Sequence, residues 1–336
     1  TGLNVGAGSS LPAGSSNVIL VQSSDVTLRD LTVDGDNPAL TSGVERGGAD
    51  LDARNGIITD HRLGQTFNNL SVHDVAVRNI YLRGIYASTG GTFEIRDNLV
   101  DNVQGEAQSI GIFNWVGSGV IAGNTVSRAN DAIAANHSRG TQFLDNVVSQ
   151  SGSGVHSDNN GDSGGVADVI RGNQVSDGTA GSYGVWVFAA RLDAVVENNV
   201  VTGVDVGLAA AGQFGGVPRF SGNVVDGQGR AGSTGIYATT SLFGWGDADL
   251  SAVFTENAIA NVADGVYVEE TGGKTAQVAL GGNSFSNLGH LAVDNDGATR
   301  VDASGNWWGS ADPTAVAALI EGDVDFTPLL AVGTDT

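Results

Sequence analysis

One short segment decides the fold: Ile121-Ala-Gly-Asn124-Thr-Val126, in which an apolar residue, two further residues, an asparagine, any residue and a second apolar residue follow one another. The pattern recurs every 22 to 34 residues, with its asparagines at Asn98, Asn124, Asn146, Asn173, Asn199, Asn223, Asn257, Asn283 and Asn306. A period of this length is typical of a solenoid, in which each repeat buries its apolar residues against the neighbouring repeats.

A second pattern lies between these asparagines: glycine, an apolar residue, an outward residue and a small inward residue, as in Gly84-Ile-Tyr-Ala and Gly235-Ile-Tyr-Ala. No repeat contains ten residues of helical periodicity, which excludes leucine-rich and helical repeats. Each repeat has room for three short strands and three turns. Because stacked parallel strands lie about 4.8 Å apart, equivalent side chains of successive repeats form ladders.

The recurring asparagine is interpreted as a structural feature rather than a site. Asparagine tolerates the left-handed backbone conformation of a sharp bend, and its amide can bond to the amides of adjacent repeats.

In these patterns the chain resembles the right-handed parallel β-helix proteins of the pectate-lyase-like superfamily, over about residues 15 to 310. The resemblance implies an all-β, single-stranded, right-handed parallel β-helix of about ten coils, with an asparagine ladder at the bend between the second and third strands of each coil. In the coil of Asn124, strand two then ends at residues 121–123, strand three covers 125–127, and the next strand one covers 133–137.

A single β-helix domain over residues 1–336 is expected. Asp312 and Pro313 fit the N-cap and first position of a short C-terminal helix, which would cover the open end of the stack. The expected parts are an irregular N-terminal segment over 1–16, coils over 17–310 and a C-terminal cap over 311–336.

The chain is acidic, with 37 Asp and Glu against 15 Lys and Arg and a net charge of −22. This charge disfavours nucleic acid and anionic membranes as partners and favours solubility. Asp-rich turns make Ca²⁺ a possible cofactor, and no other cofactor is indicated. The absence of cysteine excludes disulfides and thiolate metal sites, and no apolar run reaches membrane-spanning length. We expect a monomeric bacterial protein that is secreted or displayed at the cell surface, and a sequence that is a mature or excised piece of a longer chain.

Aromatic residues concentrate on the predicted outward positions of strand one and the turn after it, which form the binding face in most enzymes that this fold resembles. Exposed aromatic rings suit sugar binding, whereas mutual packing of the rings is the alternative interpretation. One outward column begins with Asp60, Ser88 and Trp115. The candidate substrate-binding residues are Tyr86, Phe113, Trp115, Trp186, Phe188, Tyr237 and Tyr267.

Polar candidates lie in the middle coils. His137, Arg139, His156 and Asp158 are predicted on adjacent strands, where histidine and aspartate can act in acid–base catalysis and arginine can neutralise a carboxylate. Chance groupings of this kind are also common on polar surfaces. The sequence lacks the triple-Asp set of polygalacturonases and the Asp-Pro-His-Glu run of alginate epimerases, and Lys274 is the only lysine.

Two long inserts, residues 34–54 and 240–251, are predicted to wall the binding groove. Three functions are compatible with these residues. The first is an extracellular module that binds a polysaccharide or cell-surface glycan, within a secreted protein or adhesin. The second is a polysaccharide lyase or glycoside hydrolase that uses the same groove, and the third is a structural spacer.

Overall fold

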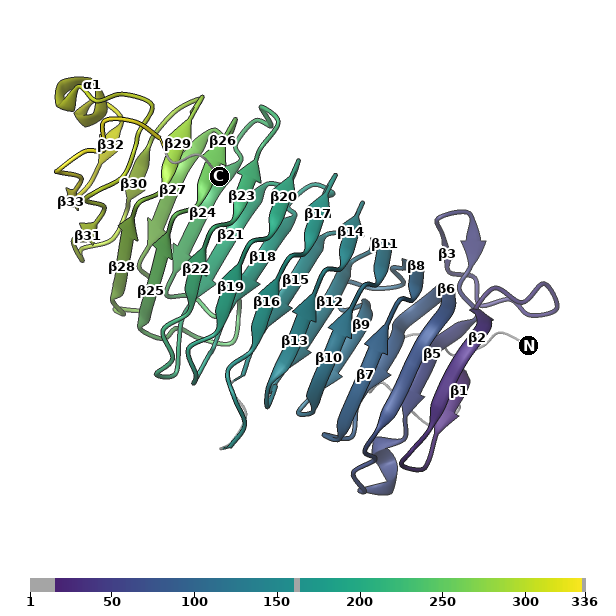
Figure 1. The fold of residues 1–336 in the computed structure, drawn as a ribbon. Coiled ribbons are helices and arrows are strands. Elements are labelled where there is room, and N and C mark those ends of the chain that lie inside the picture. The colour runs from purple at the N-terminus through teal and green to yellow at the C-terminus, as the bar shows by residue number, and fades with distance from the viewer. Residues whose placement is uncertain (1–15, 160–163, 334–336) are drawn as a thin grey trace. The chain divides into compact units, whose positions relative to one another are not determined.

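The computed structural model describes residues 16–159 and 164–333, so residues 1–15 of the expected irregular segment lie outside the described residues. The chain is an all-β parallel solenoid of about ten coils, as the sequence predicts (Figure 1). It consists of two compact units, and each is described by itself below. Unit 1 comprises residues 1–155 and 161–166, and unit 2 comprises residues 156–160 and 167–336. No helix among the described residues has the length and apolar character to cross a membrane.

Unit 1 stacks three series of strands, named strand one, strand two and strand three in their order around a coil. Strand one is formed by β1 (Asn17–Val21), β5 (Ala53–Thr59), the end of β6 (Leu70–Ala87), β9 (Ile110–Trp115) and β12 (Asp131–Asn136). Strand two is formed by β2 (Thr27–Asp34), the start of β6, β7 (Thr92–Arg96), β10 (Ser118–Ala122) and β13 (Thr141–Leu144). Strand three is formed by the last part of β2, the middle of β6, β8 (Leu99–Val103), β11 (Thr125–Ala129) and β14 (Val147–Ser149).

Unit 2 also consists of three series of stacked strands, and the boundary between the units falls within β15 (Ser153–Ser157) in the sequence. Strand one is formed by β18 (Tyr183–Val187), β21 (Val206–Ala211), β24 (Thr234–Thr239), β27 (Asp264–Glu269), β30 (Val293–Asn295) and β32 (Ile320–Glu321). Strand two is formed by β16 (Val169–Arg171), β19 (Val195–Glu197), β22 (Arg219–Ser221), β25 (Leu250–Thr255), β28 (Ala276–Gly281), β31 (Val301–Asp302) and β33 (Val324–Asp325). Strand three is formed by β17 (Gln174–Ser176), β20 (Val200–Thr202), β23 (Val224–Asp226), β26 (Ala258–Ala260) and β29 (Ser284–Ser286).

The asparagine ladder is confirmed in both units. In unit 1, the backbone N–H and Nδ2 of Asn98 both donate to Oδ1 of Asn124, at 3.0 and 2.9 Å, and Asn124 donates to Asn146 in the same way. In unit 2, Asn223 donates to Asn257 through the same two groups. Each amide also reaches a backbone carbonyl of strand two in a neighbouring coil, so the buried bend keeps its polar groups paired.

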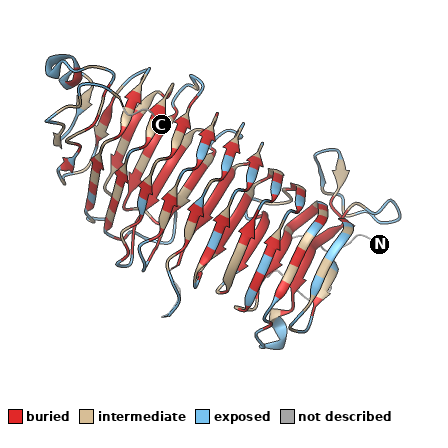
Figure 2. Cartoon of the chain, viewed as in Figure 1, coloured by how far each residue is buried: buried red, intermediate tan, exposed pale blue. Residues whose placement is uncertain are grey.

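The interior is filled by aligned apolar side chains. Figure 2 shows by colour that buried positions recur along the strands. Ile57, Ile85 and Ile112 occupy equivalent positions and are fully buried. The glycine that precedes each of them fits the stack because a Cβ on Gly84 would lie 2.4 Å from the carbonyl oxygen of Gly111. The recurring glycine of strand one is therefore required by close approach of the backbones.

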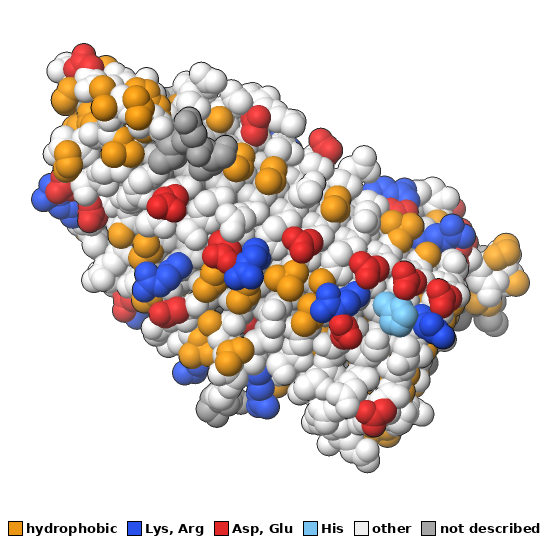
Figure 3. Space-filling model, in the orientation of Figure 1, with side chains coloured by type: hydrophobic (Ala, Val, Ile, Leu, Met, Phe, Trp, Pro, Cys, Tyr) orange, Lys and Arg blue, Asp and Glu red, His pale blue; other side chains and the backbone are white. Residues whose placement is uncertain are grey.

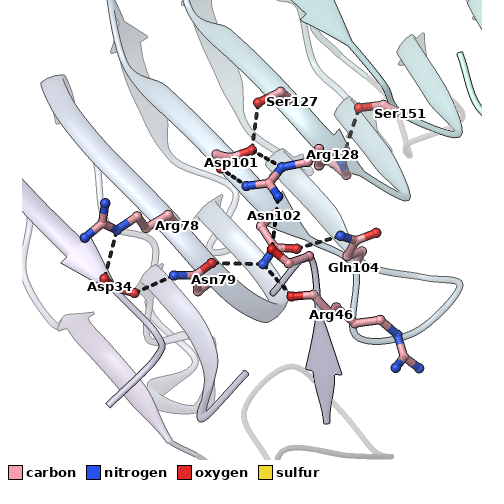
Figure 4. Close-up of polar contacts among 12 residues, drawn as sticks. Asp34, Arg46, Arg78, Asn79, Asp101, Asn102, Gln104, Ser127, Arg128 and Ser151 are labelled. Carbon is pink, nitrogen blue, oxygen red and sulfur yellow. Dashed lines mark hydrogen bonds and ion pairs between the residues drawn. The ribbon is translucent and has the colours of Figure 1, made fainter. Parts of the chain in front are cut away.

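A second polar ladder lies at the end of strand three in unit 1 (Figure 4). Asn102 donates through Nδ2 to Oδ1 of Asn79 at 2.9 Å, and Asn79 donates to Oδ1 of Asp34 at 2.8 Å. Both asparagines have positive φ angles, 59° and 58°, which asparagine tolerates at low cost. Arg128 pairs with Asp101 beside this ladder, as Figure 4 also shows. Such outer pairs agree with the interspersed acidic and basic side chains on the face in Figure 3.

The C-terminal end carries the predicted short helix, α1 (Pro313–Ala317). Asp312 is its N-cap and accepts a hydrogen bond from the backbone N–H of Thr314 at 2.9 Å, as the sequence predicts. Only Val316 of the helix is buried. The strands that follow the helix make the last pairings, because β32 pairs with β30 and β33 pairs with β31.

The two inserts form distinct structures. The first contains the short antiparallel hairpin of β3 (Glu45–Arg46) and β4 (Ala49–Asp50). The second is the turn between β24 and β25, which contains an antiparallel bridge between Ser241 and Asp247.

Candidate functional site

The aromatic column predicted on strand one of unit 1 begins with two buried rings. Tyr86 and Phe113 are 6% and 3% exposed, and their rings stack with centroids 4.6 Å apart. The guanidinium of Arg83 lies over both rings, 5.7 and 5.0 Å from their centroids. These two residues therefore offer little surface to a ligand in this structure.

Trp115, the next predicted residue, is accessible. It ends β9, is 38% exposed, and lies with its ring 4.5 Å from the ring of His137. Trp115 and Arg139 line a pocket of about 320 Å³ at the turns that follow strand one. Two predicted site residues of unit 1 thus meet at one concave surface.

The same pocket contains a pair of residues that the sequence did not single out, His61 and Ser88. His61 begins the single-turn 3₁₀ helix η1 (His61–Leu63), whose N-cap is Asp60. Nδ1 of His61 lies 3.0 Å from Oγ of Ser88, which itself lies 3.0 Å from Oγ1 of Thr59. The sequence did place Asp60 and Ser88 in the same outward column as Trp115, but His61 falls one residue beyond that column.

The charges beside His61 are paired. Asp60 is 1% exposed and accepts hydrogen bonds from Nε and Nη2 of Arg62, at 2.8 and 2.9 Å, and from Gln22 at 2.9 Å. The hydrogen bonds from Arg62 above all hold the pKa of Asp60 well below its usual range. Burial lowers the pKa of His61 from its ordinary value of 6.5, against the opposing attraction of Asp60. His61 is therefore neutral at pH 7.

In unit 2, Trp186 and Phe188 form a compact aromatic group with Tyr183 and Phe243. The rings of Trp186 and Phe188 stack 4.9 Å apart, and Phe243 meets Trp186 edge-on at 5.2 Å. Tyr183 lies 5.8 Å from both Trp186 and Phe243. We call these four residues the aromatic platform. The two predicted residues, Trp186 and Phe188, are half-buried within it.

Tyr237 and Tyr267 occupy equivalent positions of β24 and β27 and stack with centroids 5.6 Å apart and planes 6° apart. The hydroxyl of Tyr237 donates to Glu269 at 2.6 Å, and Thr239 donates to the same carboxylate oxygen at 3.0 Å. Burial and the neighbouring Glu269 raise the pKa of Tyr237. Both predicted tyrosines are half-buried and held in one orientation.

The insert between β24 and β25 presents the most exposed aromatic residue among the described residues, Trp245, at 85%. Its loop is fixed by backbone hydrogen bonds from Leu242 to the carbonyl of Gly246 and from Trp245 to the carbonyl of Leu242, at 2.9 and 3.2 Å. Leu242 is buried with Ala189 and Ala248, and Phe188 packs against this cluster. The insert thus borders the aromatic platform, although whether it walls a groove stays a prediction.

The four predicted catalytic residues divide between the units: His137 and Arg139 belong to unit 1, and His156 and Asp158 to unit 2. His156 is 5% exposed, with its ring 4.3 Å from Trp186 and 5.7 Å from Phe188. Asp158 is 3% exposed. A joint catalytic role for the four residues stays a prediction.

The parallel coils and the asparagine ladder define the chain as a parallel β-solenoid. The chain belongs to the family described as "Periplasmic copper-binding protein (NosD)", which matches residues 67–320. This description places the family in the periplasm. A comparison with curated proteins gave no match, and neither did a comparison with solved structures.

The family description raises the question of whether this chain offers a copper site. Copper in proteins is held by thiolate, thioether and imidazole groups, and this sequence contains no Cys, no Met and five His. Nδ1 of His61, His73 and His290 each bonds to a different neighbour, Ser88, Asp74 and Asp264. Over residues 16–159 and 164–333, no three His, Asp or Glu side chains are grouped to hold a metal ion. The described residues therefore do not fit a copper site.

Proposed function

We propose that this protein is a carbohydrate-binding β-helix of the bacterial envelope, which holds a polysaccharide or cell-surface glycan on aromatic side chains at the turns after strand one. The observation that carries the proposal is Trp245, 85% exposed on a hydrogen-bonded loop beside the aromatic platform. The platform residues Trp186 and Phe188 and the tyrosine pair Tyr237 and Tyr267 extend the aromatic surface in unit 2, and Trp115 supplies an accessible ring in unit 1.

Exposure of Trp245 has an energetic cost that a ligand would recover. A tryptophan side chain presents about 200 Å² of largely apolar area, so leaving most of it in water forgoes about 4 kcal/mol of burial. The loop around it is already ordered, since Phe243 also donates its backbone N–H to Oγ of Ser241 at 3.1 Å. Binding to this ring therefore requires little further ordering of the chain.

A sugar ring fits this ring better than a flat protein surface does. Trp245 stands between Gly244 and Gly246, whose φ angles of 96° and 109° favour glycine, so the residues directly before and after it add no side chain to the apolar surface at the tip. A protein interface needs about 800 Å² on each partner, whereas one sugar ring needs only one aromatic face. The net charge of −22 further favours a neutral glycan over a polyanion.

The test is native affinity electrophoresis in gels that contain a panel of neutral and acidic polysaccharides. We expect at least one polysaccharide to retard the wild-type protein, and Trp245→Ala to abolish most of that retardation. Leu99→Ala is the matched control, because Leu99 is a large apolar residue of β8 that is 50% exposed. If no polysaccharide retards the protein, or if both variants behave as the wild type does, the proposal is wrong and the structural-spacer hypothesis is favoured. Shortening of the recovered glycan would favour the hypothesis of a polysaccharide-degrading enzyme.

A further inference from the structure

The pocket of unit 1 contains a histidine whose protonation pattern is fixed by its neighbours. Oγ of Ser88 donates to the carbonyl oxygen of Thr59 at 2.5 Å. A carbonyl oxygen has no proton, so two oxygen atoms this close are stable only if the single hydroxyl proton of Ser88 lies between them. That proton is therefore not available to His61.

In its remaining hydrogen bonds, Oγ of Ser88 must then be the acceptor, and each partner must supply the proton. Oγ1 of Thr59 lies 3.0 Å away and receives the backbone N–H of Ser88 at 2.7 Å, which leaves its own proton to donate to Ser88. Nδ1 of His61, also 3.0 Å away, is the second donor. A hydroxyl donates once and accepts twice, so this assignment satisfies all the hydrogen bonds. The neutral imidazole of His61 therefore carries its proton on Nδ1 and a lone pair on Nε2.

Nε2 of His61 makes no hydrogen bond within the described part of the chain, and the residue lines the pocket of about 320 Å³. The charged and titratable groups around it are Asp60, Arg62, Tyr86 and Arg139. Asp60 is occupied by Arg62 and Gln22, and the Tyr86 ring lies 6.3 Å from the imidazole. None of the described residues that line the pocket is acidic, and the attraction of Asp60, which lies outside the lining, is outweighed by burial of His61.

The other walls define what the pocket accepts. Trp115 and Arg139 both line the pocket; a tryptophan side chain carries an aromatic face, and an arginine side chain carries donors but no acceptor. A ligand must therefore present an oxygen to Arg139, a hydroxyl proton to Nε2 of His61, and a flat apolar face to Trp115. A volume of about 320 Å³ lies at the small end of the range for ligand pockets, roughly 300 to 1,000 Å³. A sugar ring meets each of these requirements.

We propose that this pocket is a sugar-binding subsite in which Nε2 of neutral His61 accepts a hydrogen bond from a ligand hydroxyl, so that protonation of His61 releases the sugar. The inference rests on the proposed carbohydrate-binding function and deepens it by naming a subsite, its acceptor and its regulation. Ser88 is a positioning residue, because it acts on the ligand only through His61.

The direction of the pH effect follows from the donor pattern. Protonation turns Nε2 of His61 from a hydrogen-bond acceptor into a donor, so the ligand hydroxyl can no longer donate to it. The hydroxyl could still accept a hydrogen bond from the protonated ring. Protonation also adds a second positive charge to a pocket that Arg139 already lines. Burial places the pKa of His61 below 6.5, so the subsite is competent at pH 7.5 and loses affinity as the pH falls through that pKa. Loss of one well-formed hydrogen bond corresponds to a weakening of about tenfold.

The first measurement is long-range ¹H–¹⁵N NMR of the full chain labelled at histidine, without ligand. We expect His61 to be the Nδ1–H tautomer at pH 7.5, and Ser88→Ala to shift the tautomer population toward Nε2–H. Observation of the Nε2–H tautomer in the wild-type protein overturns the proposal. His73→Gln, which removes a surface histidine paired with Asp74, is the matched control and should leave the His61 signals unchanged.

The second measurement is titration with cellohexaose, chitohexaose and hexagalacturonate at pH 7.5 and at the lower pH at which the His61 nitrogen signals show a protonated imidazole, with the His61 nitrogens and the indole signals of Trp115 and Trp245 followed separately. We expect at least one hexasaccharide to shift His61 and Trp115 together, with about tenfold weaker affinity at the lower pH, where His61 is protonated. His61→Gln keeps an acceptor that does not titrate, so it should bind more weakly at pH 7.5 and show no pH dependence.

The outcomes separate this inference from the function on which it rests. If a sugar shifts the signal of Trp245 but leaves His61 and Trp115 unchanged, the subsite is wrong while carbohydrate binding stands. If a sugar shifts His61 and Trp115 with equal affinity at both pH values, the proposed role of neutral His61 is wrong. If no hexasaccharide shifts any of the three signals, the subsite is refuted and carbohydrate binding fails with it.

Discussion

Replacement of Asn223 by alanine tests the energetic role of the asparagine ladder. Asn223 is fully buried, and its Oδ1 accepts the backbone N–H of Asn199 at 3.0 Å and Nδ2 of Asn199 at 2.9 Å. Its Nδ2 donates to the carbonyl of Val196 at 3.0 Å and to Asn257 at 2.9 Å. Asn223→Ala therefore leaves the backbone N–H of Asn199 and the carbonyl of Val196 buried without these partners.

The magnitude follows from these orphaned groups. Leaving one buried polar group unpaired costs about 1 to 3 kcal/mol, so two such groups predict a loss of about 4 kcal/mol in the free energy of unfolding. Natural domains are stable by only about 5 to 15 kcal/mol. A single ladder substitution is thus expected to remove a large share of the stability of unit 2.

Urea unfolding followed by circular dichroism and tryptophan fluorescence measures this loss. Asn37→Ala is the matched control: Asn37 is an exposed loop residue whose Oδ1 accepts only the backbone N–H of Ala39, at 3.0 Å. We expect the control to lose no more than about 0.5 kcal/mol. A loss below about 1 kcal/mol for Asn223→Ala, or a loss equal to that of the control, would refute the ladder argument.

Three further predictions follow from other features. Gly207→Ala should destabilise unit 2 by about 2 kcal/mol in the same urea assay, because the new Cβ would lie 2.5 Å from Cγ1 of Val225 and 2.7 Å from the carbonyl oxygen of Gly235. An unfolding midpoint equal to that of the wild-type protein would contradict this predicted clash. Burial opposes ionisation of Asp101, but hydrogen bonds from Arg128 and Ser127 outweigh it and lower its pKa. The stability that this carboxylate contributes is therefore present above its unfolded pKa of about 3.9 and is lost as the pH falls through its lower folded pKa. In thermal unfolding from pH 6 to pH 2, Asp101→Asn should lose less stability on acidification than the wild-type protein does. Identical pH profiles for the two proteins would contradict this role of Asp101. Because the described residues offer no grouped copper ligands, equilibrium dialysis with metal analysis should find no stoichiometric retention of copper; one tightly held copper ion per chain would contradict this interpretation.

Fold and register were predictable because they rest on residues that repeat. Asn98 and Asn124 stand 26 residues apart in the chain and hydrogen-bond directly, so a recurring letter in the sequence corresponds to a contact in the structure. The recurring glycine of strand one is a second example, because Gly84 lies against Gly111 of the next coil. In a parallel stack, the sequence period alone sets which residues meet.

Exposure was less predictable than register. Alternation predicts that Tyr86 and Phe113 form an outward row beside the inward row of Ile85 and Ile112, and in the structure Tyr86 and Phe113 pair in register and share a buried cluster. Alternation gives no information on what covers a row, however, and Arg83 lies over both aromatic rings. Residues of the same column in unit 2, such as Tyr237, stay half-exposed. The burial of an outward residue depends on its particular neighbours and not on the period.

The two candidate sites arise where the turn between strand one and strand two departs from the repeat. In unit 1 this turn covers residues 60–69 after β5 but only 88–91 after β6, and the longer turn contains η1 and places His61 against Ser88. In unit 2 the corresponding turn covers residues 240–249 after β24 and presents Trp245. A turn that matches its neighbours can stack on them, whereas a longer turn must extend beyond the stack, where its side chains meet solvent or a ligand. Searching the sequence for the repeat finds the residues that stabilise the fold. The length of each turn indicates which coils depart from that repeat, and His61 and Trp245 both lie in such turns.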